Sequence, residues 1–219
     1  LFLNRKPPKK TPMTPQGLSR RPLLAGLALT LALAASPALA APAIGKPAPA
    51  FTAVDAQGKA RSLAEFRGKT VVLEWTNEGC PYVQKHYDSG AMQGLQKAAA
   101  ADGVVWLSII SSAPGKQGYK TAAEARAWQD KSGVAAAAVL LDPKGEVGRA
   151  YSARTTPHMY IVNPAGNLVY MGGIDDKNSA DPATLQGARN YVSLALADLK
   201  AGRAVAQPVS APYGCSVKY

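Results

Sequence analysis

The chain has 219 residues, and its 25 Lys and Arg against 14 Asp and Glu give a formal net charge of +11. Six of the positive charges and no acidic residue fall in residues 1–40, so residues 41–219 carry a mild excess of +5. That part has neither a run of like charges nor aromatic residues interleaved with basic ones, which argues against nucleic-acid binding.

The first 40 residues have the pattern of an export signal. Arg20-Arg21 precede an apolar run from Leu23 to Ala35, and Ala38-Leu39-Ala40 supplies a small-x-small cleavage pattern. The run is too short for a transmembrane helix. We therefore expect 1–40 to be an N-terminal extension and signal peptide. It resembles the twin-arginine type, and an ordinary secretory signal is the alternative. The remainder, 41–219, should be one domain, periplasmic or secreted and without a stable membrane anchor.

The apolar patterns of residues 41–219 indicate an α/β fold. We expect a short hairpin near residues 51–58, a short helix over 63–66 and a first core strand over 70–76. The later elements expected are helices over 81–87, 92–101 and 121–131, strands over 104–110, 139–141, 158–162 and 168–171, a short helix or turn over 145–151, a last helix over 183–201, and a tail over 202–219. The strands joined by helices should be parallel, and the last two should form an antiparallel hairpin at the sheet edge.

Cys80 occupies the position with the clearest chemical consequence. It lies between the end of the strand over 70–76 and the first turn of the next helix, and Pro81 suits the first helical position. Unpaired N–H groups at a helix N-terminus stabilise an anion, so the thiol should ionise easily and act as a nucleophile. The alternative is that Cys80 is a small buried core residue.

Cys215 is the only other cysteine, and its role stays open at this stage. In an exported protein the two cysteines can form one disulfide or remain separate thiols. A structural disulfide would close a loop of roughly 135 residues and stabilise the fold by about 4–5 kcal/mol. A weaker alternative is a copper-handling module, with both cysteines and a histidine as soft ligands.

Two landmarks resemble the thioredoxin fold, and in particular its peroxiredoxin and redoxin branch. Cys80-Pro81 falls where the family has its reactive cysteine, and Thr156-Pro157 falls where the family has a cis-proline loop facing that cysteine. The segments Gly45–Phe51 and Asn77–Val83 and the ending Gly214–Tyr219 resemble a bacterial peroxiredoxin-like group. The resemblance implies a central mixed β-sheet flanked by helices, with an N-terminal β-hairpin extension and a C-terminal tail.

The resemblance also implies an activity, that of an exported thiol oxidoreductase of the antioxidant type. Cys80 would attack a peroxide or a disulfide, Cys215 would be a resolving cysteine, and an unidentified thiol would be the reductant. No cofactor or metal is implied, and the oligomeric state is left open. The residues expected to contact substrate are Thr156, Pro157, Trp75 and Tyr82, although core packing also explains Trp75.

Two departures from the family pattern limit this interpretation. Val83 stands where disulfide-exchange members have their second cysteine. Asn77 and Leu73 stand where peroxiredoxins have a Thr or Ser and a Pro, so the usual peroxide-orienting hydroxyl is absent unless Thr76 replaces it.

Several other polar residues are secondary candidates. His158 follows the proline and could approach Cys80, whereas His86 does not share a face with the start of its helix. Residues that could shuttle protons or favour the thiolate are Glu74, Glu78, Arg149 and Arg154. Asp175 and Asp176 follow the expected hairpin, and we expect both to face solvent.

Overall fold

The structure is a computed structural model in which residues 7–12 and 41–219 are described. The predicted arginine pair, apolar run and cleavage pattern lie outside the described residues. Within the described ranges, no helix combines the length and the apolar character that crossing a bilayer requires.

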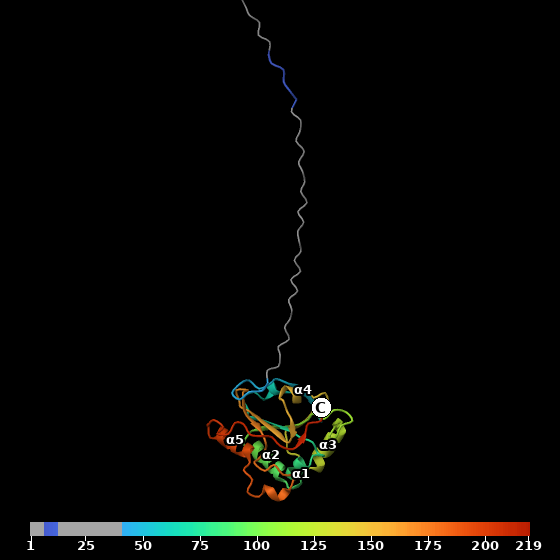
Figure 1. Cartoon of the computed structure of the whole chain (residues 1–219), viewed down its shortest axis with the longest axis vertical. Helices are drawn as coiled ribbons and strands as arrows, with labels where there is room; N and C mark the ends of the chain where they lie inside the picture. Colours follow the sequence, from blue (N-terminus) through green and yellow to red (C-terminus); the bar gives the residue numbers. More distant parts are fainter. Residues whose placement is uncertain (1–6, 13–40) are drawn as a thin grey trace, which may run out of the picture. The chain divides into compact units, whose positions relative to one another are not determined.

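Residues 41–219 build a seven-stranded mixed sheet with helices on both faces (Figure 1). Its strands are β1 (Thr52–Asp55), β2 (Ala60–Ser62), β3 (Val71–Trp75), β4 (Val105–Ile110), β5 (Ala138–Leu141), β7 (His158–Val162) and β8 (Leu168–Gly172). The helices are α1 (Pro81–Asp88), α2 (Ala91–Ala101), α3 (Ala122–Lys131), α4 (Glu146–Ala150) and α5 (Tyr191–Lys200), with the 3-10 turns η1 (Leu63–Phe66) and η2 (Pro182–Leu185). The predicted mixed sheet flanked by helices is confirmed.

The strand order is β2-β1-β5-β4-β3-β7-β8. As predicted, β3, β4 and β5 are parallel, and β7 and β8 form an antiparallel hairpin with β8 at the edge. Every residue of β3 and β4 is buried, because helices cover both faces of these central strands. Helices α1, α2, α3 and α5 pack on one face, and α4 packs on the other (Figure 1).

The last predicted helix is divided into two shorter elements. The sequence pattern indicated one helix over 183–201, but η2 ends at Leu185 and α5 begins at Tyr191. Gly187 lies between them with φ of 72°, a conformation that interrupts a helix. Asn190 then caps α5, because its side chain accepts a hydrogen bond from the Ser193 N–H at 2.8 Å.

The tail over 202–219 also contains a strand that the sequence pattern did not indicate. Residues Cys215–Ser216 form β9, which pairs with β6 (Thr155–Thr156) in a separate two-stranded sheet. The tail therefore returns to the loop that precedes β7.

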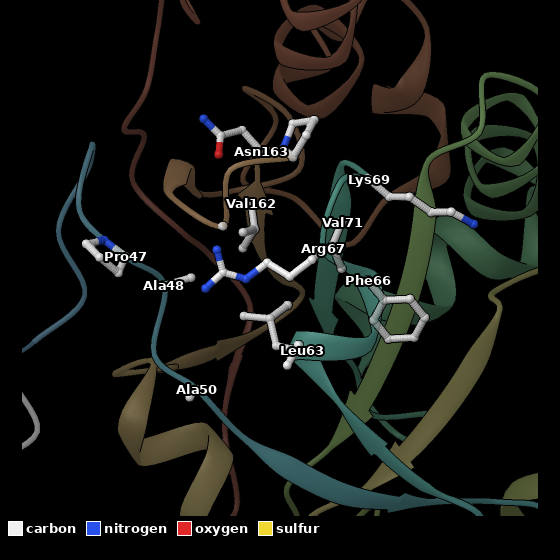
Figure 2. Close-up of a pocket in the computed structure, with 13 residues that line it drawn as sticks. Pro47, Ala48, Ala50, Leu63, Phe66, Arg67, Lys69, Val71, Val162 and Asn163 are labelled. Carbon is white, nitrogen blue, oxygen red and sulfur yellow. The ribbon is translucent and has the colours of Figure 1, made fainter.

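Figure 2 shows an apolar pocket whose volume is about 80 Å³. It is lined by Val71 at the start of β3 and Val162 at the end of β7, and the Arg67 guanidinium donates a hydrogen bond to Ala165 O at 2.8 Å. Cys80 follows the other end of β3, so this pocket does not belong to the thiol site.

Candidate functional site

Cys80 is the N-cap residue of α1, as the sequence indicated. Its carbonyl oxygen accepts hydrogen bonds from the N–H groups of Val83 and Gln84, both at 2.9 Å, and its own N–H donates to Asn77 O at 3.0 Å. Pro81 occupies the first helical turn, where it lacks only an N–H that the helix would leave unpaired. The side chain is 0 % exposed, so the thiol is fixed at the helix start and covered.

The proline loop faces this thiol. The bond from Thr156 to Pro157 is cis, as predicted. The Cys80 thiol donates a hydrogen bond to the carbonyl oxygen of Thr156 at 3.1 Å, across 76 positions of the sequence. The two landmarks that carried the resemblance are therefore in direct contact.

Cys215 lies beside the same loop. In the antiparallel pair of β6 and β9, Thr156 is opposite Cys215 and Thr155 is opposite Ser216. Gly214 allows this approach, because a Cβ at Gly214 would overlap the carbonyl oxygen of Thr156, and its φ is +121°. Both cysteines are free thiols, and Cys215 is partly exposed.

The two thiols have opposite pKa shifts. Burial raises the pKa of Cys80, but the neighbouring side chains of Cys215 and Thr156 and the N–H groups of Cys215 and Val83 favour the thiolate, outweigh burial and lower the pKa below its ordinary value. Burial and the neighbouring Cys80 raise the pKa of Cys215 to about 11. Cys80 is therefore the thiol that ionises first.

The Thr156 hydroxyl contributes to this difference. Thr156 Oγ1 is buried and has no hydrogen-bond partner within the described part of the protein. An unpartnered buried donor is unfavourable, and the Thr156 side chain lowers the pKa of the neighbouring Cys80 thiol by favouring its thiolate. The hydroxyl is therefore available to the thiolate form of Cys80.

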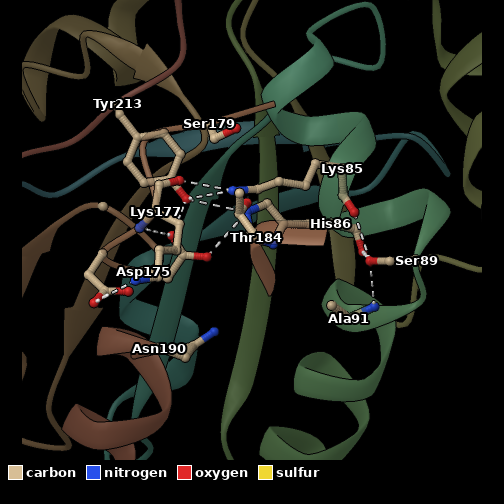
Figure 3. A network of polar contacts seen from close by, with 12 residues as sticks. Lys85, His86, Ser89, Ala91, Asp175, Lys177, Ser179, Thr184, Asn190 and Tyr213 are labelled. Atoms are coloured by element: carbon tan, nitrogen blue, oxygen red, sulfur yellow. Dashed lines mark hydrogen bonds and ion pairs between the residues drawn. The ribbon is translucent and has the colours of Figure 1, made fainter. Parts of the chain in front are cut away.

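Tyr213 holds the tail on the N-terminal side of Cys215. Its hydroxyl donates a short hydrogen bond to Asp175 Oδ1 and lies 3.4 Å from His86 Nε2 (Figure 3). The Lys85 ammonium lies 5.2 Å from the centre of the Tyr213 ring and donates to Lys177 O at 3.0 Å. Lys85 and His86 belong to α1, so this network connects the tail to the helix that Cys80 caps.

Asp175 corrects one expectation and Tyr213 adds a residue that sequence reasoning missed. Asp175 was expected to face solvent, but it is 2 % exposed, because Tyr213 and His86 cover it. Asp176 is exposed, as expected. The only local sequence feature that could have indicated a role for Tyr213 is that it directly precedes Gly214-Cys215.

Tyr219 holds the tail on the other side of Cys215. Its hydroxyl donates to Ala153 O at 2.7 Å, and the Arg149 guanidinium lies 4.7 Å from its ring centre. Gly145 and Gly148 leave the space for the ring, since a Cβ at either position would overlap it. Arg149 thus contacts the tail.

Glu74 is fully buried beneath α1 and α2. Its carboxylate accepts hydrogen bonds from Trp106 Nε1 at 2.8 Å and Ser108 Oγ at 2.9 Å, and also from Tyr87 and Gln96. Burial raises its pKa, although these four donors oppose the effect. Glu78, by contrast, forms an ion pair with Lys120.

His158 supports the loop. Its Nδ1 accepts a hydrogen bond from the Arg154 N–H at 3.2 Å, and its ring lies 4.6 Å from the Tyr160 ring centre. Burial, with a contribution from the Arg154 charge, lowers the pKa of His158 to about 3. The imidazole is therefore neutral at pH 7.

The two aromatic residues that flank Cys80 in sequence lie in different environments. Trp75 is fully buried, packs on Tyr151 and Tyr160, and donates to Ser111 Oγ at 3.0 Å. This is the packing role that the sequence also allowed. Tyr82 is partly buried, and its ring lies 5.9 Å from the Tyr213 ring of the tail.

The histidines do not join the cysteines in a metal-ligand cluster. Within residues 7–12 and 41–219, no group of three His, Cys, Asp or Glu side chains is arranged to hold a metal ion. The copper alternative therefore has no three-residue ligand set in these ranges.

Comparisons with known proteins agree with this fold. Residues 44–171 match the model of the AhpC/TSA family. The chain is similar to the crystal structure of an uncharacterized conserved protein from Geobacillus kaustophilus, with 25% identity, a TM-score of 0.71, and 81% of this chain and 92% of that chain covered. A hypothetical protein from Sinorhizobium meliloti 1021 is 23% identical, with a TM-score of 0.68 and 81% and 94% of the two chains covered. None of the curated proteins compared with the sequence matches it.

Proposed function

Because the chain belongs to the AhpC/TSA family and has the thioredoxin fold, we propose that it is a thiol-dependent oxidoreductase. In this proposal Cys80 attacks the oxidant and Cys215 resolves the product. The observation that carries the proposal is the pairing of two free thiols of opposite pKa shift at the cis-proline loop. The partner of the cycle is a thiol reductant.

The first step consumes the oxidant. The Cys80 thiolate attacks an oxygen of a hydroperoxide, the S–O bond forms as the O–O bond breaks, and the departing alkoxide or hydroxide takes up a proton to leave as an alcohol or as water. Cys80 becomes a sulfenic acid. With a disulfide as oxidant, the S–S bond breaks instead and a thiolate leaves.

The second step uses Cys215. Its sulfur attacks the sulfenic sulfur of Cys80, the S–S bond forms, and the leaving hydroxide combines with the Cys215 proton as water. A pKa of about 11 keeps Cys215 protonated in the resting protein, so it does not compete with Cys80 for the oxidant. Two electrons from the external thiol then restore both cysteines.

The test uses single substitutions at the two cysteines with Ser216→Ala as a matched control, because Ser216 is the exposed neighbour of Cys215 in β9. Peroxide consumption is measured with dithiothreitol as reductant, and the protein mass is measured after a single exposure. Cys80→Ser should abolish turnover. Cys215→Ser should leave Cys80 with one added oxygen, and Ser216→Ala should behave as the unchanged protein.

The opposite result is equally clear. If both cysteine substitutions lower the free energy of unfolding equally and no variant or parent protein consumes peroxide or disulfide, the two cysteines have only a structural role and the proposal is wrong.

We also propose that residues 41–219 act outside the cytoplasm. The support is the sequence pattern of residues 1–40, together with two cysteines suited to a compartment where disulfides form. N-terminal sequencing should find a mature chain that starts near Ala41, and soluble cytoplasmic protein that retains residues 20–40 would contradict the proposal.

A further inference from the structure

The C-terminal segment occupies a strand edge beside the nucleophile. Residues 213–219, termed here the C-terminal clasp, supply β9, whose residues pair with β6 next to the cis-proline. The pairing continues beyond β9, because the Val217 N–H donates to Arg154 O at 3.0 Å. The clasp therefore takes the backbone hydrogen-bonding groups that an added strand would need at this edge.

The clasp is held on both sides of Cys215. Tyr213 is buried in the network of Asp175, His86 and Lys85 (Figure 3). At the other end, Tyr219 lies in the space left by Gly145 and Gly148. With both anchors closed, Cys80 is 0 % exposed.

We propose that the C-terminal clasp determines which oxidants reach Cys80, admitting small hydroperoxides and small disulfides and excluding polypeptide disulfides. The inference rests on the proposed function, because it assigns the substrate class of the same thiol. Tyr213 and Tyr219 are the specificity-determining residues of this selection.

The reason is competition for one set of backbone groups. An extended polypeptide binds a free strand edge by adding a strand to it, and the edge of β6 becomes free only after β9 has left and both tyrosines are released. A small oxidant does not pair with β6, so a local movement of Cys215 is enough to admit it. The two classes of oxidant therefore differ in how much of the clasp must open.

A glycine substitution releases one anchor without changing the clasp itself. In Gly148→Ala the added methyl group would overlap the Tyr219 ring. Gly94→Ala is the matched control, because Gly94 also lies in a helix and a Cβ there has no atom within 4 Å. A second variant ends at Lys218, so it lacks Tyr219 and removes the same anchor by another route.

Three probes separate size from chemistry. They are hydrogen peroxide, an extended cysteine peptide activated as its thionitrobenzoate mixed disulfide, and a single blocked cysteine carrying the same activated disulfide. Cys80 attacks the activated disulfide, thionitrobenzoate leaves with the electron pair, and its absorbance gives the rate. Peroxide oxidation is followed by the mass of the protein after capping of free thiols.

We expect the unchanged protein to react with both small probes and much more slowly with the peptide. Gly148→Ala and the chain without Tyr219 should react with the peptide about tenfold faster, which corresponds to the loss of one hydrogen bond and one cation–π contact. Their rates with the small probes should not change, and Gly94→Ala should match the unchanged protein. Amide exchange at Val217 should also accelerate in the two anchor variants.

Two contrary outcomes are distinguishable. If the small probes oxidise Cys80 but the peptide rate stays the same after Tyr219 is released, the clasp does not select the oxidant, while the proposed function survives. If no probe oxidises Cys80 in any variant, the proposed function fails and the selection fails with it.

Discussion

The lowering of the Cys80 pKa by the Cys215 side chain leads to a testable prediction. Cys215→Ala removes the side-chain donor, whereas Cys215→Ser keeps an O–H donor at the same position, and both leave the Cys215 backbone N–H in place. The donor favours the thiolate of Cys80. Its loss favours the thiol form, so the pKa of Cys80 should be higher in the alanine variant than in the serine variant.

The size of the difference follows from the charge on the acceptor. A hydrogen bond to a charged group contributes about 1.5–3 kcal/mol, and one pH unit corresponds to about 1.4 kcal/mol. The pKa of Cys80 should therefore lie roughly 1 to 2 pH units higher in Cys215→Ala than in Cys215→Ser.

The assay is the ultraviolet absorbance of the thiolate during a pH titration. It does not require a reagent to reach the buried sulfur, and Cys80 is the only thiol in either variant. The same titration of each variant with Cys80→Ser added supplies the background from tyrosine. Equal titration midpoints in the alanine and serine variants would show that the Cys215 side chain donates no hydrogen bond to Cys80. The claim that this side chain lowers the pKa of Cys80 would then be wrong.

Two further predictions concern single side chains of the site. Thr156→Val should raise the pKa of Cys80 in the same titration, because the Thr156 side chain favours the thiolate. It should not lower the free energy of unfolding, because the buried hydroxyl has no hydrogen-bond partner in the described residues, and clear destabilisation in urea would contradict this. Burial lowers the pKa of His86 from 6.5 to about 4. Between these two pH values the unfolded state binds more protons than the folded state. The free energy of unfolding should therefore fall by up to about 3 kcal/mol as the pH is lowered from 6.5 to 4. In urea unfolding at several pH values, His86→Gln should reduce the dependence of the free energy of unfolding on pH. An unchanged dependence would show that His86 does not cause the decline.

Much of the fold and part of the site follow from local sequence. The apolar runs at β3 and β4 predict buried strands because a strand covered on both faces needs apolar side chains throughout. Cys80-Pro81 marks the start of α1 because capping depends on neighbouring residues. The break at Gly187 was missed, since the apolar spacing of the flanking residues continues across it.

The packing of the tail depends on contacts between distant parts of the chain. Tyr213 meets Asp175 and His86 across 38 and 127 positions of the chain, and no local pattern encodes such a contact. A carboxylate can be buried only where other groups supply its hydrogen bonds. The local sequence around Asp175 therefore predicts a solvent-facing charge, whereas in the fold Tyr213 supplies a hydrogen bond and Asp175 is buried. Local sequence is enough to place Cys80 at the start of a helix. The position of Cys215 beside it follows from tertiary packing, because it depends on anchors from α1, α4 and the segment after β8.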